Sequence, residues 1–508
     1  MSSTLIMAYA GLGLTAYFII LVLYRLFLHP LASFPGPKLA AATAWYEFYH
    51  DAIRRGKYTF EIQEMHDKYG PIVRISPEEL HCNDPSFIPT LYTGGSARRN
   101  KYGHFADAWI MFGTLDHDLH RLRRKALNRF FSKASISKLE PVIHEKVELL
   151  GQQLCTYLKD KGPVNITHGF SCLTGDVIMA YCFARNENFL GDRSFQSTHY
   201  YAQRDISFLG LYSKHFPFVL PLTLSLPSML RRALNPYVNQ YMEWVLKVRA
   251  QICRISSQKE ASKQIADEKS HATIFDGILE SDLPDEEKTL DRLWQEFEAV
   301  LDAGTDTVAW ALSVLFFYIL NDRTICETLI SELKDAIPDA TSRPSWTELE
   351  KLPYLIRLRL SYGLSTRLQR ISPDGPMLYE PSDFVTASKS QYMIPQGTPV
   401  GMTSVMIHHD PNIFPNSKEF KPSRWLDAEG NMDRTLEKYL LNFSKGSRQC
   451  IGINLAYTEL FITTSMLFRR LGSRMKLYET GLDDVESKHH PFMPYPRLDS
   501  KGIRVVMV

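Results

Sequence analysis

The fold is decided by ten residues near the C-terminus, 443–452, which read FSKGSRQCIG. They place a single cysteine, Cys450, between two glycines and directly before a run whose apolar spacing predicts a helix. A thiol at a helix N-terminus lies at the positive end of the backbone dipole, and Arg448 adds a cation two residues away. Cys450 is therefore expected to be a thiolate, which is a good ligand for a soft metal.

The residues around Cys450 suit a flat ligand that carries negative charge. Gly446 permits a backbone turn that a side chain would obstruct, and Gly452 lets the ligand approach the helix start closely. Phe443 can cover the sulfur, and Arg448 can reach an anionic group beside it. These features suit an iron porphyrin. The alternatives are an inert buried cysteine and a zinc site, but no second Cys or His lies within the usual zinc-ligand spacing.

The pattern F-x-x-G-x-R-x-C-x-G resembles the haem-binding loop of the cytochrome P-450 haem-thiolate monooxygenases, and every fixed position is filled. The resemblance implies a mainly α-helical cytochrome P-450 fold with small β-sheets. It also implies haem b as the cofactor, Cys450 as the axial ligand of its iron, and Arg448 on a haem propionate.

Composition narrows the other possibilities. The 508 residues include 58 basic and 56 acidic side chains, a net charge of +2, so nothing suggests a nucleic-acid partner. The seven cysteines are odd in number and scattered, with no C-x-x-C pair. That pattern is typical of a reduced, cytosol-facing protein rather than of a disulfide framework.

The N-terminus predicts a membrane anchor. Residues 5–24 carry no charge and are long enough to cross the hydrocarbon core of a bilayer, and Arg25 and Lys38 follow. A cleaved signal peptide is the alternative, but it would have a basic start and a shorter apolar run. We expect an anchor and flank over 1–30, a catalytic domain over 31–508, and a single-pass protein of the endoplasmic reticulum membrane whose domain faces the cytosol.

A basic helix is expected over Asp116 to Phe130. In the family that the loop resembles, a W-x-x-x-R pair on this helix holds a haem propionate. His120 and Arg124 occupy that spacing here, one turn apart on one face, with His in place of the usual Trp. A solvated basic face, for instance for a partner protein, is the alternative.

A long core helix is expected over residues 291–321, because it is apolar almost all round from Val308 to Leu320. It contains the sequence AGTDT (303–307), which weakens a helix. This stretch resembles the oxygen-binding motif of the family, which implies that Gly304 makes room above the iron while Asp306 and Thr307 relay protons. A kink with satisfied hydroxyl groups is the alternative.

The sequence departs from the family in one helix. The family carries E-x-x-R there, and its Glu and Arg join a second, downstream Arg to brace the haem pocket. Arg359 fits the first Arg and Arg424, in the F-x-P-x-R-W segment 420–425, fits the second, but Ile356 stands where the Glu belongs. The helix also appears about five residues short, which is not a whole number of turns at about 3.6 residues each. Arg370, in an expected strand, is the preferred second propionate partner.

Further elements follow from pattern alone. We expect a helical stretch over 46–69 with a break near Gly56, and a small sheet from 72–75 and 79–81. Residues 392–400 read as strand, turn and strand, and 256–271 and 281–288 as surface connections. Two stretches dense in Phe, Leu, Tyr and Pro, 100–113 and 208–230, read as loops. By resemblance they cover the substrate cavity, and the second could rest on the membrane; ordinary core loops are the alternative.

The phrases YRLFLHPL (24–31) and FPGPKL (34–39) are similar to those of filamentous-fungal members, particularly the group around trichodiene oxygenase. By analogy, the protein would insert one oxygen atom of O2 into a small hydrophobic secondary metabolite, a terpenoid or a polyketide. NADPH-cytochrome P-450 reductase would supply the electrons. The competing hypotheses are a catalytically impaired, membrane-anchored haem protein that lacks the Glu of E-x-x-R, and a rearrangement that needs no reductase.

Overall fold

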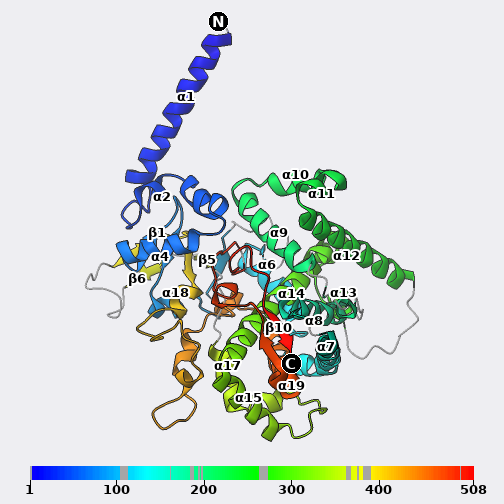
Figure 1. Cartoon of the computed structure of the whole chain (residues 1–508). Helices are drawn as coiled ribbons and strands as arrows, with labels where there is room; N and C mark the ends of the chain where they lie inside the picture. The colour runs from blue at the N-terminus through cyan, green and yellow to red at the C-terminus, as the bar shows by residue number, and fades with distance from the viewer. Residues whose placement is uncertain are drawn as a thin grey trace.

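The structure is a computed structural model of the whole chain. It describes residues 3–95, 97–102, 113–160, 162–183, 188–192, 195, 198–261, 273–361, 368–373, 377–380, 391–491 and 493–508. For 158–160, 198–199, 256–261 and 368–373 only the backbone is described. The family-typical architecture expected from the sequence, mainly α-helical with small β-sheets, is present (Figure 1).

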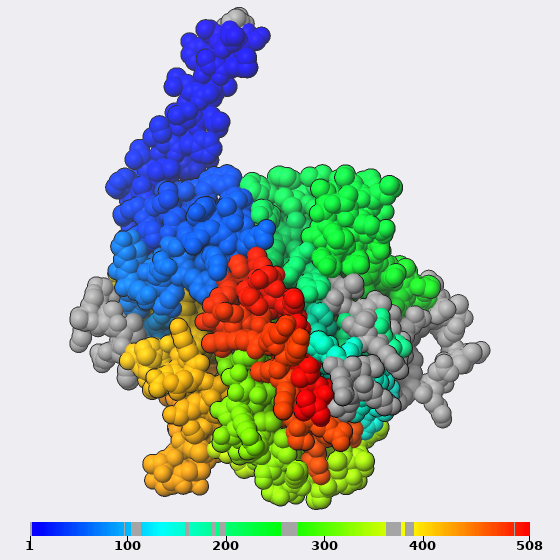
Figure 2. All heavy atoms as spheres, viewed as in Figure 1, coloured from blue at the N-terminus to red at the C-terminus, as the bar shows by residue number. Residues whose placement is uncertain are grey.

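The N-terminal helix stands apart from the rest of the molecule. α1 (Ser3–Leu23) continues into a π-helical turn, η1 (Tyr24–Leu28), and none of its residues is buried. Figures 1 and 2 show it projecting from one end of the folded body. By length and composition the 26 residues Ser3–Leu28 could cross a membrane, so α1 is a candidate membrane anchor.

The main hydrophobic core is built by four long helices: α7 (Lys133–Asp160), α8 (Ile166–Phe183), α14 (Leu290–Asn321) and α19 (Ile453–Leu471). α14 is also long and apolar enough to cross a membrane, but most of it is buried inside the protein. It is therefore the core helix that the apolar run predicted, and its expected bounds of 291–321 are confirmed to within one residue.

The other helices surround this core, and several of their starts follow from local sequence. Asp116 caps α6 by accepting a hydrogen bond from the Leu119 amide at 2.8 Å, and Asp322 caps α15 in the same way. The remaining α-helices are α2 (Lys38–Ala42), α3 (Trp45–Phe48), α4 (Tyr58–Tyr69), α5 (Ile88–Leu91), α6 (His117–Asn128), α9 (Thr198–His215), α10 (Val219–Ser225), α11 (Ser228–Leu234), α12 (Pro236–Ala261), α13 (Ile274–Leu279), α15 (Arg323–Ala336), α16 (Trp346–Leu349), α17 (Pro353–Ser361) and α18 (Ser404–His408).

Three small sheets lie around the helical core. The largest has the strand order β1-β2-β8-β5-β3, with β1 (Ile72–Arg74) antiparallel to β2 (Leu80–Cys82), as the alternating segments predicted. The others have the orders β4-β10-β9 and β6-β7. The remaining strands are β3 (Arg99–Lys101), β4 (Val164–Asn165), β5 (Leu368–Pro373), β6 (Met377–Tyr379), β7 (Tyr392–Ile394), β8 (Val400–Thr403), β9 (Met475–Leu477) and β10 (Arg504–Met507).

Several predicted elements are confirmed. The stretch 46–69 is helical, as α3, a π-helical turn η2 (Tyr49–Ile53) and α4, and it breaks at Gly56, whose φ is +74°. Residues 392–400 do form strand, turn and strand, although β7 pairs with β6 whereas β8 pairs with β2 and β5. The basic helix 116–130 is α6 with its cap.

The loop prediction for 208–230 is wrong. α9 runs to His215, and α10 and α11 follow, so this stretch is mostly helical. The prolines favoured a loop prediction, but Pro221 and Pro227 lie near helix starts. At a helix start the missing N–H group of proline leaves no helical hydrogen bond unmade. The connection predicted for 256–271 likewise begins as helix, since α12 extends to Ala261. Of the predicted loop 100–113, residues 103–112 lie outside the described part of the chain.

Several apolar side chains of this region are nonetheless exposed on the surface. Phe218, Leu222, Met229 and Leu234 of the α10–α11 region are all more than half exposed. Figures 1 and 2 show α10 and α11 at the same end of the molecule as α1.

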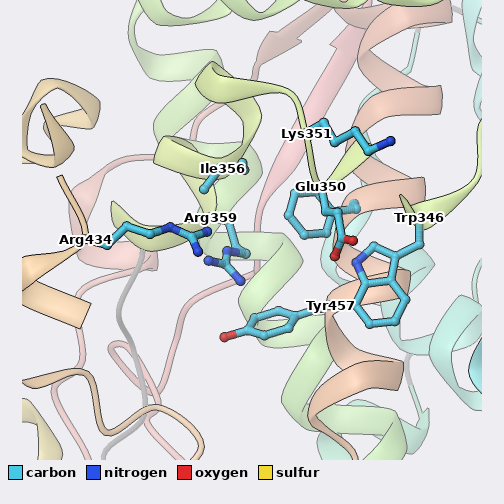
Figure 3. A pocket seen from close by; sticks show the side chains of 8 residues that line it. Trp346, Glu350, Lys351, Ile356, Arg359, Arg434 and Tyr457 are labelled. Atoms are coloured by element: carbon cyan, nitrogen blue, oxygen red, sulfur yellow. The ribbon is translucent and has the colours of Figure 1, made fainter. Parts of the chain in front are cut away.

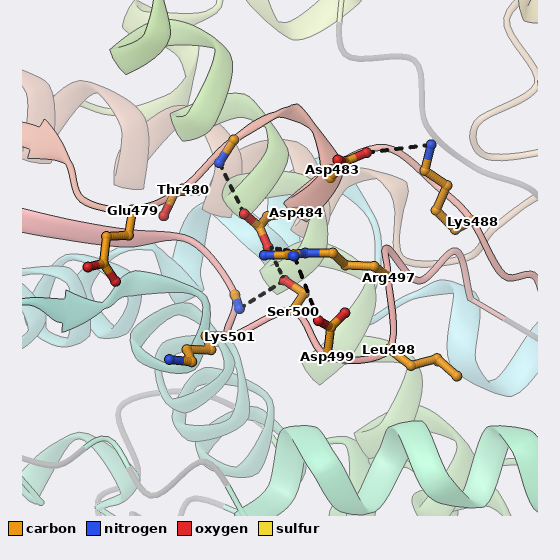
Figure 4. A network of polar contacts seen from close by, with 12 residues as sticks. Glu479, Thr480, Asp483, Asp484, Lys488, Arg497, Leu498, Asp499, Ser500 and Lys501 are labelled. Carbon is orange, nitrogen blue, oxygen red and sulfur yellow. Dashed lines mark hydrogen bonds and ion pairs between the residues drawn. The ribbon is translucent and has the colours of Figure 1, made fainter.

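The C-terminal segment is held by a buried carboxylate, Asp484 (Figure 4). It accepts hydrogen bonds from the Ser500 hydroxyl at 2.7 Å and from the Gly481 amide at 3.0 Å, and it pairs with Arg497 at 3.3 Å. The Arg497 guanidinium and these bonds keep the pKa of Asp484 below its ordinary value despite burial, which raises it. These contacts of Asp484 hold the segment that contains the buried residue Tyr495.

Candidate active site

Cys450 lies in a tight loop that ends at the start of α19. A 3-10 turn (Gly446–Arg448) precedes it, and its amide donates a hydrogen bond to the Phe443 carbonyl at 2.8 Å. The Phe443 ring packs edge-on against Tyr457 of α19, with ring centres 4.9 Å apart. α19 begins at Ile453, three residues after the cysteine, so the predicted position before a helix start is confirmed. The loop therefore presents one sulfur from a fixed backbone.

Gly446 is required by both conformation and space. Its φ is +71°, and a Cβ there would lie 2.5 Å from the Thr93 carbonyl oxygen and 2.6 Å from that of Tyr92. These are backbone atoms, so they cannot rotate away. Gly452 differs, because no atom lies within 4 Å of the position its Cβ would take. That open space fits the sequence prediction that a flat ligand comes close to the helix start.

We expect Gly446→Ala to lower the free energy of unfolding by about 2–4 kcal/mol, from the positive φ and from the collision with the 92–93 backbone. Gly430→Ala is the matched control, since Gly430 has φ +82° with nothing within 4 Å. Chemical denaturation of both variants separates the two causes. Equal losses would mean that the close contact with Thr93 contributes nothing.

Basic side chains converge beside the cysteine loop. Arg124 of α6 donates to the Gln449 carbonyl at 2.6 Å, and Arg448 donates to the carbonyls of Thr114 at 2.7 Å and Leu115 at 2.9 Å. His120, also on α6, is buried. Burial and then the Arg448 and Arg124 charges lower its pKa to about 3. The cluster of positive charge fits the two carboxylates of an iron porphyrin.

Arg370 can be placed only by its backbone. It lies in β5, opposite Gly401 of β8 in the five-stranded sheet. Its side chain lies outside the described part of the chain. Its role as a propionate partner therefore stays a prediction.

On α14, Gly304 and Thr307 face different surroundings. A Cβ on Gly304 would lie 2.7 Å from Cγ1 of Ile178, so this glycine lets α14 and α8 pack closely. Ala303 is exposed although it lies in the middle of a core helix, and the Thr307 hydroxyl donates to the Ala303 carbonyl at 2.8 Å. The side of α14 that borders open space is thus formed by Ala303 and Thr307, one turn apart.

Asp306 is half-buried, and its Oδ1 is buried without a hydrogen-bond partner among the described residues. Burial and then the neighbouring Asp302 carboxylate raise its pKa well above the ordinary value, which favours the protonated acid. The Asp306 charge in turn contributes to the raised pKa values of Tyr200 and Tyr495, so both phenols lie near it. The predicted acid and alcohol pair therefore comprises two half-buried residues, a carboxyl group with a buried oxygen and a hydroxyl group bonded to the helix backbone.

The sequence reading missed two further carboxyls on the same helix. Glu298 and Asp302 precede Asp306 at intervals of one turn, and the Tyr241 hydroxyl of α12 contacts both, at 3.1 Å and 2.6 Å. A hydroxyl carries one hydrogen, so one of these two contacts needs a hydrogen from the carboxyl group. Gln203 of α9 donates to Asp302 at 2.5 Å. The i, i+4, i+8 spacing was the signal that could have revealed them.

Burial raises the pKa of both Glu298 and Asp302. Because the pKa of Glu298 rises from its ordinary value of 4.5 to about 8, the folded protein holds a proton that the unfolded chain has lost between these pH values. The contribution of Glu298 to the free energy of unfolding is fully present below pH 4.5. It decreases as the pH rises toward 8, by at most about 1.4 kcal/mol per pH unit for one proton.

We expect Glu298→Gln to flatten the dependence of unfolding free energy on pH between about 5 and 8. Denaturant unfolding at several pH values measures it. The control is Asp291→Asn, which alters an exposed acid on the same helix that pairs with Arg249 on the surface. If Glu298→Gln keeps the wild-type slope, the proton is not on Glu298.

The two arginines predicted to brace the haem pocket have separate surroundings. The Arg359 guanidinium stacks on Tyr457 of α19, 4.4 Å from the ring centre, and Arg424 donates to the Asn416 carbonyl at 2.8 Å. Ile356 is buried one turn before Arg359. α17 has nine residues, consistent with the shortening inferred from sequence. The brace itself stays a prediction.

The donors present fit an iron porphyrin. The sulfur of Cys450 can take the metal, the Arg124, His120 and Arg448 cluster can take the propionates, and the missing Cβ at Gly452 leaves space for a flat ring. α14, which carries Asp306 and Thr307, packs against α19. These residues define a haem-thiolate protein.

Comparison with known proteins agrees. The sequence profile described as Cytochrome P450 matches residues 42–479. The chain is 41% identical to the cytochrome P450 monooxygenase sdnE of Sordaria araneosa, over 96% of this chain and 95% of that protein. It is 38% identical to the fusicoccadiene C-8 hydroxylase of Phomopsis amygdali and to the tryptophan 6-hydroxylase fscE of Fusarium equiseti, each over 96% of this chain and 94% of the relative. The chain belongs to the cytochrome P450 family, and it is a haem-dependent monooxygenase.

Proposed function

We propose that this monooxygenase hydroxylates or epoxidises a hydrophobic secondary metabolite of a fungal pathway, a terpenoid first and a polyketide second. The observation that carries the proposal is the loop 443–452 with Cys450 at the start of α19. The relative named fusicoccadiene C-8 hydroxylase supports a terpenoid. The tryptophan 6-hydroxylase fscE supports an aromatic amino acid or indole as a further candidate.

The residues divide the work between holding the cofactor and moving protons. Haem supplies the activation of O2 and the insertion of one of its oxygen atoms. Cys450 would hold the iron, while Arg124, His120, Arg448 and Arg370 would hold the propionates. Thr307 presents its hydroxyl to the open side of α14, and Asp306 keeps a proton beside it because burial raises its pKa.

Electrons reach the protein from NADPH-cytochrome P-450 reductase in this proposal. Arg121 and Lys125 are exposed on α6, and Arg129 is exposed at its C-terminal cap; Arg124 of the same helix contacts the cysteine loop. A positive surface this close to the metal-binding residue suits an acidic partner that must come within electron-transfer range.

The membrane is the second partner. Residues 1–30 would anchor the protein in a single pass through the endoplasmic reticulum membrane, and 31–508 would form the cytosolic catalytic domain. The exposed apolar side chains of α10 and α11 lie at the anchor end of the molecule, which suits contact with the lipid surface. A hydrophobic substrate would then enter from the bilayer.

A second candidate function is kept because of one observation. Ile356 is buried where the family carries a Glu, so a catalytically impaired, membrane-anchored haem protein would have this sequence too. In that case the protein would bind haem and fail to turn over.

The test is reconstitution of the full chain in lipid with the reductase. A ferrous carbon monoxide difference spectrum with the Soret band of thiolate ligation establishes haem binding by Cys450. NADPH-dependent oxygenation of a terpenoid panel supports the proposal, and thiolate-bound haem without turnover of any candidate favours the impaired protein. Turnover that needs no NADPH would instead indicate a rearrangement.

A further inference from the structure

A cavity of 330 Å³ opens between α16, α17 and α19 (Figure 3). Arg359, Lys351 and Arg434 line it, together with one carboxylate, Glu350. Ile356 contributes hydrocarbon where a polar side chain could have reached Arg359. The cavity is large enough for several water molecules or one small anion.

Arg359 is an incompletely satisfied cation. Its guanidinium lies over the rings of Tyr457 and Phe461, with the ring centres at 4.4 and 5.7 Å. Its Nε is buried and has no hydrogen-bond partner among the described residues. An aromatic face attracts the charge but accepts no strong hydrogen bond, so the buried Nε–H group still needs an acceptor.

The remaining charges around the cavity do not supply that acceptor. Glu350 pairs with Lys133 at 2.6 Å. Arg434 uses its Nε to contact Glu437 at 3.0 Å and stays mostly exposed. In the view of Figure 3 the Arg434 guanidinium points toward that of Arg359. Two guanidinium groups that share a cavity repel each other unless an anion lies between them.

We propose that this cavity binds a small oxyanion, a carboxylate or a phosphate, held between Arg359 and Arg434. The guanidinium fork matches both carboxylate and phosphate oxygens and binds them through paired hydrogen bonds. The bound anion ties α17 to the segment that contains η9 (Thr435–Tyr439), which leads into the cysteine loop. It takes the place that an acidic side chain at position 356 would occupy.

The test is thermal unfolding of the full chain in detergent, with sodium phosphate or sodium acetate exchanged for sodium chloride at constant ionic strength. We expect a saturable rise in melting temperature of about 1 to 2 °C for a single occupied site in a chain of this size. Phosphate and acetate arms distinguish the two oxyanions, and titration calorimetry gives the stoichiometry. Neither measurement depends on haem or turnover, so the outcome is separate from that of the proposed function.

Substitution of the two cavity arginines tests the site, and a neighbouring arginine on α17 provides the control. Arg359→Gln and Arg434→Gln should abolish the rise, whereas Arg357→Gln should keep it, because Arg357 stacks on Tyr354 and does not line the cavity. Ile356→Glu should raise the melting temperature without added anion and remove the response. Two results would overturn the proposal. One is a rise in melting temperature that persists in both Arg359→Gln and Arg434→Gln; the other is the same melting temperature in chloride as in phosphate and acetate.

Discussion

We expect Cys450→Ala to abolish both thiolate-bound haem and NADPH-dependent turnover. The substitution removes the one sulfur that the loop presents at the start of α19, while the backbone bond from residue 450 to the Phe443 carbonyl can remain. We expect the protein to fold, with unchanged far-ultraviolet circular dichroism, and the thiolate-type carbon monoxide band to disappear. Turnover should fall below detection.

Cys326→Ala is the control for loss of any thiol. Cys326 is free and half-buried on α15, and burial raises its pKa to about 11, so it stays protonated. Its removal should leave the spectrum and turnover unchanged. Turnover retained by Cys450→Ala would refute the assignment of the axial ligand.

Thr307→Val should separate NADPH consumption from product formation. The hydroxyl of Thr307 borders the open side of α14, and in the proposed function it carries a proton to the reacting site. Without it, we expect NADPH oxidation to continue, hydrogen peroxide to accumulate, and product per NADPH to fall by about tenfold or more. Paired assays of NADPH, peroxide and product measure the change.

Thr305→Val is the matched control. Thr305 makes the same kind of hydrogen bond, to the Leu301 carbonyl at 2.8 Å, but its side chain is buried. It should leave coupling unchanged. If both variants uncouple alike, the effect comes from the geometry of α14 and not from a proton carried by Thr307.

Elements with a strong local signal were predictable from the sequence. The apolar run of α14, the helix after Cys450 and the capped α6 all depend on residues close in the chain. The region 208–230 was predicted wrongly because proline breaks a helix only when it lies in the helix interior. Here the prolines lie near helix starts, where a helix tolerates them.

The site was predictable where one motif carries it. Cys450, Gly446 and the pair Asp306 and Thr307 belong to short contiguous patterns. The Tyr241 bridge between Glu298 and Asp302 was not, because it joins α12 to α14, and its polar groups are paired only once the helices have packed. The cavity at Arg359 likewise depends on which residues surround an arginine, which sequence order does not give.

The close packing of α8 on α14 has a consequence for how this enzyme could change its substrate. A Cβ at Gly304 would lie 2.7 Å from Cγ1 of Ile178, so a larger residue there would push the two helices apart. Substitutions there would displace Thr307 and degrade the chemistry for every substrate alike. New specificity should therefore arise by mutation of α10 and α11, since α9 and α12 are bonded to Asp302 of α14 through Gln203 and Tyr241. Laboratory evolution toward a new compound would do best to randomise those helices and leave the α8–α14 contact intact.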